Sequence, residues 1–256
     1  MALTPEAIET FTRLFGSAPE PSPTDPELME TLQNHIFGEV FSVGILTDVE
    51  RELITVTCMA SMQTLPQLRA HAAAALNVGA TPEQLREVIY QCQPYIGYPK
   101  TLNAIGVLNE VLTERGVELP LPSAATVDYA DRDVAGAAIQ IPLYGDEVKA
   151  VFAKLPEPFD TQVPHLLTGI GFGEVESRGV LSLAEREIVS LVAIAAIGAA
   201  TQLTPHVAGA IKAGNTRQKV AAALVQAMPY IGGPYALTGL VLVANYDPNA
   251  SSEAYR

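Results

Sequence analysis

The sequence contains two copies of one pattern, offset by 135 residues without a gap. The tetrapeptide FGEV at residues 37–40 recurs at 172–175, and the tripeptide ERE at 50–52 recurs at 185–187. Between residues 50 and 102, 18 of 53 positions are identical in the second copy, which is far more than chance produces. The chain is therefore a tandem duplication, and it must fold as two similar units.

The positions that both copies retain are rich in charged, histidine, tyrosine and glycine residues. They include the ERE segments, a histidine in each copy, and the PYIG segments at 94–97 and 229–232. Core positions have instead exchanged one apolar residue for another, as Leu53 and Ile188 have. A core needs only suitable volume. The retained polar residues are therefore the candidates for a functional site.

Composition excludes several classes of partner. The chain has 256 residues and a net charge of −13, which argues against binding to nucleic acid or to an anionic membrane. The apolar stretch at 188–200 is too short to span a bilayer and is interrupted by Ser190. The first residues lack a basic segment followed by an apolar run, so we expect no secretory signal and a cytoplasmic location.

Both copies carry the signals of the same succession of helices. Glu50 and Glu185 each follow a Thr or Ser by three residues, which is the capping box that opens a helix and which accounts for both glutamates. In the first copy, further helices are expected at 65–76, from Pro82 onward and at 101–114. The sequence predicts an all-α fold.

The segment around PLPS at 120–123 reads as a linker between the copies. We divide the chain into a first unit, a linker and a second unit, at residues 1–117, 118–139 and 140–256. Upstream of the FGEV segments, residues 146–155 are expected to mirror the helix at 6–15. The stretch 138–143 is ambiguous between helix and strand.

Acid–base chemistry would centre on His71 and His206. They coincide under the 135-residue offset, and both lie in alanine-rich helical segments. A histidine in such a helix can be a satisfied core residue, but it is also the natural proton carrier near neutral pH. His35 and His165 lack a counterpart in the other copy, so we interpret them as structural.

Charged candidates come from the ERE segments. Glu52 and Glu187 stand beyond the capping positions on apolar helices, so they either stay at an exposed first turn or enter a polar pocket. Arg51 and Arg186 could form surface ion pairs of little energetic weight. Arginine in both copies also suits planar recognition of a carboxylate or carbonyl group. These alternatives stay open.

Other residues could complete a pocket. Tyr95 and Tyr230, in the PYIG segments, combine a ring that packs with a hydroxyl that needs a partner. Glu39 and Glu174, in the FGEV segments, are weaker candidates for substrate binding.

The two cysteines and the metal-binding residue types point away from redox and metal chemistry. Cys58 and Cys92 lie in apolar helical patterns, which favours small buried side chains over a disulfide. His, Cys and Asp residues do not cluster at metal-ligand spacing, so we expect no metal site.

Taken together, these motifs resemble the carboxymuconolactone decarboxylase family, which has the alkylhydroperoxidase D-like all-α fold. The resemblance rests on FGEV, the ERE segment, the histidine on the next helix and PYIG followed by proline, in both copies. It covers residues 37–112 and 172–246. Because family members are usually single repeats that pair and form trimers of dimers, it implies an intramolecular pseudo-dimer and a homotrimer.

The family that the sequence resembles has two branches, which differ in their chemistry. Its redox branch uses a C-x-x-C pair four residues before the histidine. The corresponding positions here are Thr64 and Gln67, and Ala199 and Gln202. Without a low-pKa thiolate and a resolving thiol, a peroxidase cycle has no nucleophile. The other branch is a cofactor-free decarboxylase.

The sequence thus predicts a cofactor-free enzyme that decarboxylates a small lactone or carboxylic acid, γ-carboxymuconolactone or a relative. The resemblance assigns a role to each retained pair: the arginines hold anionic groups, the histidines transfer the proton, and the glutamates orient the histidines. Two alternatives are a thiol-dependent hydroperoxide reductase and a non-catalytic binding protein. The binding protein would have a filled apolar core around both histidines.

Overall fold

The computed structural model describes residues 2–247 and is all-helical over that range. The first unit consists of α1 (Pro5–Phe15), α2 (Pro26–Gln33), η1 (Asn34–Glu39), η2 (Val40–Ser42), α3 (Asp48–Met62), α4 (Leu65–Asn77), α5 (Pro82–Ile96) and α6 (Tyr98–Glu114). The second consists of η3 (Tyr129–Asp131), α7 (Arg132–Tyr144), α8 (Glu147–Phe152), α9 (Phe159–Leu166), η4 (Leu167–Glu176), α10 (Leu183–Ala196), α11 (Ala200–Lys212), α12 (Arg217–Ile231) and α13 (Gly233–Ala244). The predicted all-α fold is confirmed.

Both predicted capping boxes are present and set the starts of α3 and α10. The Thr47 side chain accepts from the backbone N–H of Glu50, whose carboxylate accepts from the Thr47 backbone N–H at 2.8 Å. Ser182 and Glu185 form the same pair of bonds. Each reciprocal pair satisfies backbone donors that would otherwise lack partners at the first turn.

The two units share their core. α3 packs against α10 and α12, and α10 packs against α5, so each central helix contacts the other unit. One apolar cluster adds Leu46, Ile54 and Cys58 of the first unit to the core of the second. The other cluster adds Leu181 and Val189 of the second unit to the first. The chain is therefore an intramolecular pseudo-dimer of two repeats, as the duplication implies.

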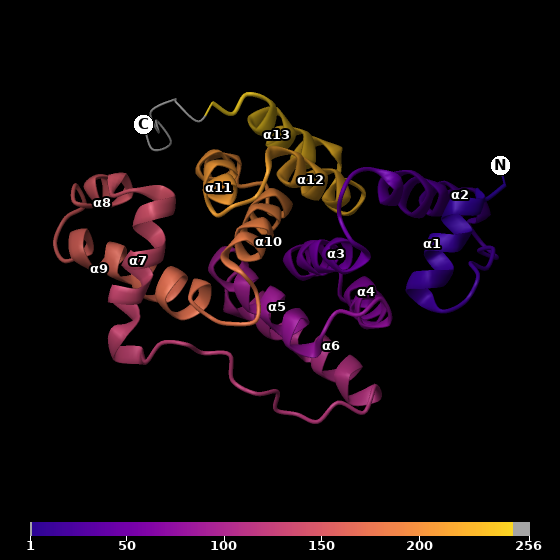
Figure 1. Cartoon of the computed structure of the whole chain (residues 1–256), viewed down its shortest axis with the longest axis horizontal. Helices are drawn as coiled ribbons and strands as arrows, with labels where there is room; N and C mark the ends of the chain where they lie inside the picture. The colour runs from indigo at the N-terminus through magenta and orange to yellow at the C-terminus, as the bar shows by residue number, and fades with distance from the viewer. Residues whose placement is uncertain (1, 248–256) are drawn as a thin grey trace.

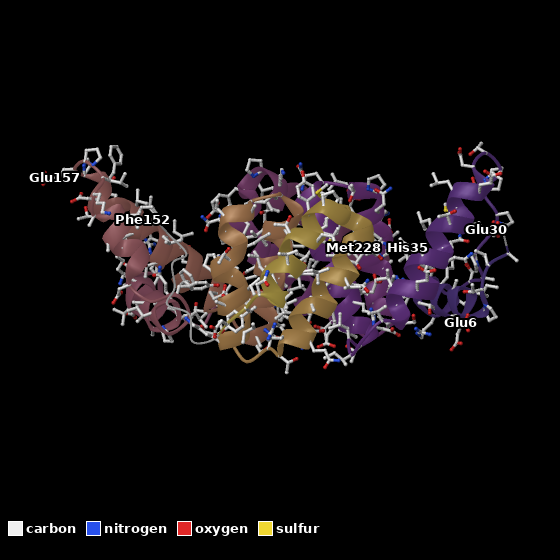
Figure 2. The ribbon with its side chains drawn as sticks, turned by 90° about the horizontal axis from the view of Figure 1, so that it is seen from above. Glu6, Glu30, His35, Phe152, Glu157 and Met228 are labelled. Atoms are coloured by element: carbon white, nitrogen blue, oxygen red, sulfur yellow. The ribbon has the colours of Figure 1, made fainter. Side chains whose placement is uncertain are left out.

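The remaining helices lie at the two ends. Figure 1 shows α1 and α2 at one end and α7, α8 and α9 at the other, with α3, α5 and α10 between them. From above, Glu6 and Glu30 mark one extremity, and Phe152 and Glu157 mark the other (Figure 2). α1 and α2 pack on the π-helical segment η1, and α7 and α9 pack on its counterpart η4. η1 carries most of the first FGEV sequence, and η4 carries the whole of the second.

The helix that corresponds to α1 is α7, not the segment 146–155 that the sequence suggested. α1 packs on η1 and α4, and α7 packs in the same way on η4 and α11. Both helices end in a leucine, an aromatic residue and a left-handed glycine, Gly16 (φ 79°) and Gly145 (φ 68°). The ungapped offset misplaced this helix because the connections that follow α1 and α7 differ in length. α7 also contains the ambiguous stretch 138–143, and it begins inside the predicted linker.

Glycines bring α7 unusually close to η4. A Cβ atom placed on Gly136 would lie 2.1 Å from the carbonyl oxygen of Thr168, and one on Gly173 would lie 2.0 Å from that of Arg132. Backbone atoms cannot yield as a flexible side chain can, so only glycine fits at these positions. The close approach fixes the position of Tyr144 at the end of α7.

Candidate active site

Arg51 joins the two repeats. Its guanidinium donates to the carbonyl oxygens of Val40 (3.1 Å) and Val43 (2.7 Å), and to Oε1 of Gln226 in the other repeat (2.8 Å). The guanidinium group of Arg51 is thus bonded to groups of the protein itself. These contacts hold the loop before α3 against α12.

Arg186 makes the equivalent contacts in the second repeat. It is fully buried and donates to the carbonyl oxygen of Gly179 (2.7 Å), to Oε1 of Gln91 (2.9 Å) and to the carboxylate of Glu87 (3.1 Å). Gln91 and Gln226 are themselves related by the 135-residue offset. Their identity in both copies was a usable sequence signal for this cross-repeat pairing.

The histidine and glutamate of the first repeat form a direct dyad. Nδ1 of His71 lies 2.8 Å from Oε2 of Glu52, which is fully buried at the first turns of α3. Two aromatic rings flank the imidazole edge-on, Tyr230 of the other repeat and Phe15 of α1, each with its centroid at 5.6 Å. Glu52 has thus entered a buried polar site, one of the two alternatives left open by the sequence.

In the second repeat a tyrosine hydroxyl stands between the same two residues. Tyr144 donates to Oε2 of Glu187 at 2.5 Å, and its oxygen lies 2.8 Å from Nδ1 of His206. The direct distance from His206 Nδ1 to Glu187 Oε2 is 3.7 Å. Tyr95 of the other repeat lies edge-on to His206 with its ring centroid at 5.6 Å. The histidine and glutamate of the second repeat are therefore linked through the tyrosine hydroxyl, in the hydrogen-bonded chain Glu187–Tyr144–His206.

Tyr144 reaches this position because both repeats place an aromatic residue at the end of their first helix. Phe15 ends α1 and Tyr144 ends α7. Gly209 makes room for the larger residue, since a Cβ there would lie 2.5 Å from the tyrosine hydroxyl; the first repeat has Ala74 at the matching position. Sequence reasoning missed Tyr144 because the ungapped offset paired the wrong segments.

The hydrogen bonds of Tyr144 determine which ring nitrogen of His206 carries the proton in the neutral imidazole. Burial raises the pKa of Tyr144 well above its ordinary value, and the charge of Glu187 raises it further, so the hydroxyl keeps its proton. Because that single proton is donated to Glu187, the hydroxyl oxygen must accept from Nδ1–H of His206. The lone pair of the neutral imidazole then lies on Nε2, the nitrogen available for proton transfer.

A cavity of about 340 Å³ adjoins His206. Its polar lining comes from several elements and consists of Tyr95, Gln140, Tyr144, Glu176, Gln202 and His206. Its apolar lining includes Phe152, Leu167, Phe172, Ile194 and Ile197. A space of this size, mostly apolar with a few converging polar groups, suits a small organic molecule.

Glu176 is the unexpected member of that lining. It ends η4, and its exposed fraction is 5%. Its Oε2 accepts a hydrogen bond from the amide of Gln91, whereas Oε1 is buried without a partner among the described residues. The first repeat has Phe41 at the matching position, so Glu176 did not stand out among the residues retained in both copies.

Burial is the main cause of an unusual pKa at Glu176. Together with the nearby charge of Glu187, it raises the pKa of Glu176 to about 8, although the hydrogen bond from Gln91 and the charge of Arg186 act in the opposite direction. The carboxyl group is therefore mostly neutral at pH 7.

The structure does not bring the remaining predicted residues to the site. Glu39 is exposed and pairs with His35 at 3.4 Å. Glu174 forms an ion pair with Arg132 at 2.9 Å. Neither glutamate of the FGEV segments lines the cavity beside His206, nor does either arginine of the ERE segments.

Neither thiol is well suited to attack a substrate in this cavity. Cys58 and Cys92 are fully buried and free, and neither lines it. Burial raises the pKa of Cys58 far above its ordinary value and that of Cys92 to about 12. Over residues 2–247 we find no cluster of three potential metal ligands and no helix long and apolar enough to cross a membrane.

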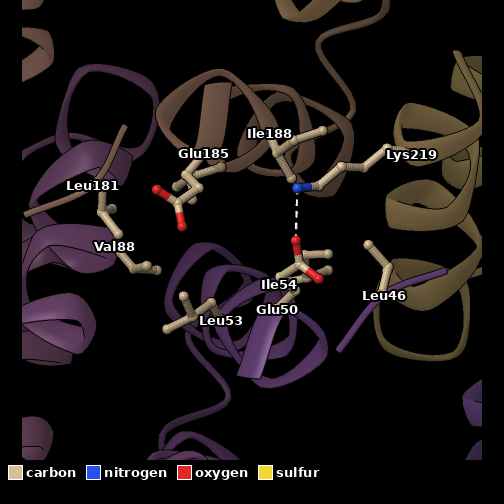
Figure 3. A pocket seen from close by; sticks show the side chains of 10 residues that line it. Leu46, Glu50, Leu53, Ile54, Val88, Leu181, Glu185, Ile188 and Lys219 are labelled. Carbon is tan, nitrogen blue, oxygen red and sulfur yellow. Dashed lines mark ion pairs between the residues drawn. The ribbon is translucent and has the colours of Figure 1, made fainter. Parts of the chain in front are cut away.

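A second, much smaller cavity lies between the repeats. It has a volume of about 30 Å³ and is lined by both capping glutamates, Glu50 and Glu185. Figure 3 shows Lys219 reaching across it to Glu50, at 2.6 Å. The space is of the order of one water molecule, so this cavity is part of the inter-repeat packing and not a substrate site.

Comparison with known proteins agrees with the repeated architecture. A sequence model of the carboxymuconolactone decarboxylase family matches residues 26–110 and again residues 161–244, which together make up more than half of the chain. The chain belongs to the carboxymuconolactone decarboxylase family. Each matched segment contains one ERE motif and its histidine.

A curated relative within this similarity is the 4-carboxymuconolactone decarboxylase of Acinetobacter baylyi. It is 32% identical over 81 residues, which amount to 32% of this chain and 60% of the relative. The match thus spans less than two thirds of the relative's length.

Proposed function

We propose that this family member is a cofactor-free carboxy-lyase whose reaction takes place in the cavity beside His206. The substrate would be a small lactone acid or related carboxylic acid, with γ-carboxymuconolactone as the first candidate. The observation that carries the proposal is the Glu187–Tyr144–His206 chain, which presents Nε2 of a histidine next to a largely apolar cavity.

Decarboxylation of such a substrate needs little from the protein. The carbon–carboxylate bond breaks and CO₂ leaves, while the bonding electron pair passes through the conjugated double bond to the lactone carbonyl oxygen. A proton must then be delivered to carbon as the pair returns from the oxygen. The protonated imidazole of His206 would supply this proton from Nε2, and solvent would restore it.

Tyr144 and Glu187 would support the histidine during this transfer. The carboxylate of Glu187, acting through the tyrosine hydroxyl, stabilises the imidazolium form, and the hydrogen bond at Nδ1 holds the ring in one orientation. The apolar lining would limit solvation of the departing carboxylate. Cross-repeat packing of Tyr95 on His206 means that the site would need both repeats.

The first repeat is better suited to a structural role. Phe15 packs edge-on against His71, and its ring also contacts Phe11 and Phe37 within one apolar cluster. We therefore assign turnover to the second repeat. The aromatic packing around His71 fits a structural role, whereas the cavity at His206 favours an enzyme.

A thiol-dependent peroxidase is disfavoured by the cysteines. Both thiols are fully buried, and burial raises their pKa values, so neither offers a thiolate to peroxide.

The decisive experiment compares two histidine variants. Release of CO₂ from γ-carboxymuconolactone is measured for the wild type, His206→Ala and His71→Ala. Loss of acid–base catalysis at His206 should lower kcat by about 100-fold or more. His71→Ala should keep most of the wild-type rate, provided that its fold is intact by circular dichroism. The opposite ranking would move the active site to the first repeat, and turnover unchanged in both variants would refute histidine catalysis.

A further inference from the structure

Among the residues that the structure describes, those that line the cavity beside His206 include no arginine or lysine. Its charged or chargeable groups are an acid, a histidine and tyrosines, and the nearby arginine, Arg186, is committed to Gln91, Glu87 and backbone carbonyls. Decarboxylation nevertheless places negative charge on an oxygen of the substrate. A neutral hydrogen-bond donor in the lining would help to stabilise that oxygen.

Glu176 has the geometry of such a donor. The orientation of its neighbour is fixed because Arg186 can only donate, so Oε1 of Gln91 faces Arg186 and the amide nitrogen faces Oε2 of Glu176. This leaves Oε1 of Glu176 buried and unpartnered among the described residues, while the Glu176 side chain contributes to the lining of the cavity. An ionised oxygen in that position would be costly, whereas a protonated one can donate to a ligand.

The groups around Glu176 favour the neutral form. Glu187 on α10 repels a second negative charge, and Tyr95 on α5 and Tyr144 on α7 keep their protons because burial raises the pKa of each. Arg186 on α10 attracts a negative charge and so acts in the opposite direction, but burial and the charge of Glu187 outweigh it. His206 on α11 lines the same cavity.

We propose that Glu176 is a protonated carboxylic acid that donates a hydrogen bond from Oε1 to the carbonyl oxygen of the substrate as negative charge develops there. No covalent bond forms to the protein, and the proton of Glu176 stays on Glu176 throughout. This assignment rests on the proposed function for the identity of the reaction. It also names the substrate class, a compound with a carbonyl acceptor conjugated to the carbon that loses CO₂. The second repeat alone has this acid, since Phe41 occupies the corresponding place in the first.

Two variants of Glu176 separate a donor from mere packing. Glu176→Gln keeps a hydrogen-bond donor of the same shape and abolishes titration. Glu176→Leu keeps the volume and removes the donor. With γ-carboxymuconolactone, we expect kcat for Glu176→Leu to fall by about 100-fold, the usual effect of losing one such donor. The kcat of Glu176→Gln should lie at least about tenfold above that of Glu176→Leu, since an amide is a weaker but competent donor. Equal losses in both variants would overturn the assignment.

The pH profile gives a second test of the same groups. The alkaline decline of kcat should differ between the wild type and Glu176→Gln, because only the wild type loses a hydrogen-bond donor when Glu176 ionises. An identical alkaline limb in both proteins would contradict a role for the neutral acid.

An infrared measurement tests the protonation state without any substrate. The difference spectrum of wild type minus Glu176→Gln at pH 7 should contain the C=O stretching band of a protonated carboxyl group, and the band should vanish at high pH. A missing band overturns the inference whatever the turnover. A band in a protein that releases no CO₂ from γ-carboxymuconolactone would support the neutral acid while refuting the proposed reaction.

Discussion

At the scale of single residues, one hydroxyl distinguishes the two histidine sites. Phe15 and Tyr144 end equivalent helices, but only the tyrosine can enter the hydrogen-bonded chain between His206 and Glu187. The hydroxyl lengthens the path from glutamate to histidine, so the charge of Glu187 reaches the imidazole through a relay. Duplication has thus produced one direct dyad and one relay from a common pattern.

Removal of that hydroxyl should uncouple the relay. In Tyr144→Phe, Glu187 loses its partner and His206 loses the acceptor at Nδ1, so we expect kcat for CO₂ release to fall by about 10-fold or more. We also expect the free energy of unfolding to fall by about 1–3 kcal/mol, because a buried carboxylate is left without this hydrogen bond. Steady-state kinetics and urea denaturation measure the two effects.

The matched control for Tyr144→Phe is Tyr98→Phe, which removes a hydroxyl from an exposed tyrosine on α6. It should leave both kcat and the urea midpoint near the wild-type values. If Tyr144→Phe behaved like this control, the relay would have no part in catalysis.

At the scale of elements, the close contact of α7 with η4 supports the site. Tyr144 comes from the end of α7, and Glu176 from the end of η4. Gly136 and Gly173 let the two backbones approach within a distance that no Cβ tolerates. The positions of the relay and of the acid therefore depend on one helix contact.

Gly136→Ala tests this contact. The added Cβ would meet the carbonyl oxygen of Thr168, so α7 must move, and we expect a loss of about 1–3 kcal/mol in the free energy of unfolding, as in overpacked cores. Gly106→Ala, in the interior of α6 with nothing near its Cβ, is the control and should stabilise the protein by about 0.5–1 kcal/mol. Urea midpoints measure both. Two stabilising substitutions would show that α7 is not tightly packed.

At the scale of the whole molecule, the repeats are joined through buried charges and a shared core. Burial alone would raise the pKa of Glu87, but its hydrogen bonds and ion pairs with Arg178 and Arg186 outweigh burial and lower the pKa. Glu87 therefore contributes stability that is lost as the pH falls through its folded pKa. Glu176 contributes stability in its protonated form, and this stability is lost as the pH rises through its raised pKa.

The pH dependence of stability should reveal Glu176. Its pKa rises from an ordinary 4.5 to about 8 on folding, so between these values the folded protein holds a proton that the unfolded chain has released. The free energy of unfolding then falls as the pH rises through this window, by up to about 1.4 kcal/mol per pH unit. Glu176→Gln should remove this slope. We would compare the two proteins by urea denaturation from pH 5 to pH 9, and parallel curves would exclude a raised pKa.

Assembly is a further prediction at this scale. α6 and α13 expose apolar residues at matching positions, Leu102 and Leu237, with exposed fractions of 68% and 53%. We expect a trimer, as the family resemblance implies, to bury these exposed leucines in the contacts between its chains. Light scattering should give three times the chain mass of 27.2 kDa. A single-chain mass would refute the homotrimer.

Local and repeated features were accessible from the sequence, because each is encoded within a few adjacent residues. The duplication, the all-α fold, the capping boxes at Glu50 and Glu185, and the two histidines belong to this group. The pairing of His71 with Glu52 was expected from the family resemblance and is present. The role expected for the arginines was not matched by their positions, because retention in both copies is equally compatible with cross-repeat packing.

The tertiary structure alone showed that His206 lines a cavity and which partners each histidine has. Tyr144 and Glu176 approach His206 and Gln91 from segments far apart in the chain, and neither has the same residue type at the matching place in the first repeat. Periodicity and capping report on neighbours along one helix. Burial, an unpartnered carboxyl oxygen and a shared proton arise only when separate helices pack, so those properties of the site exist in the folded pair of repeats and not in either sequence copy.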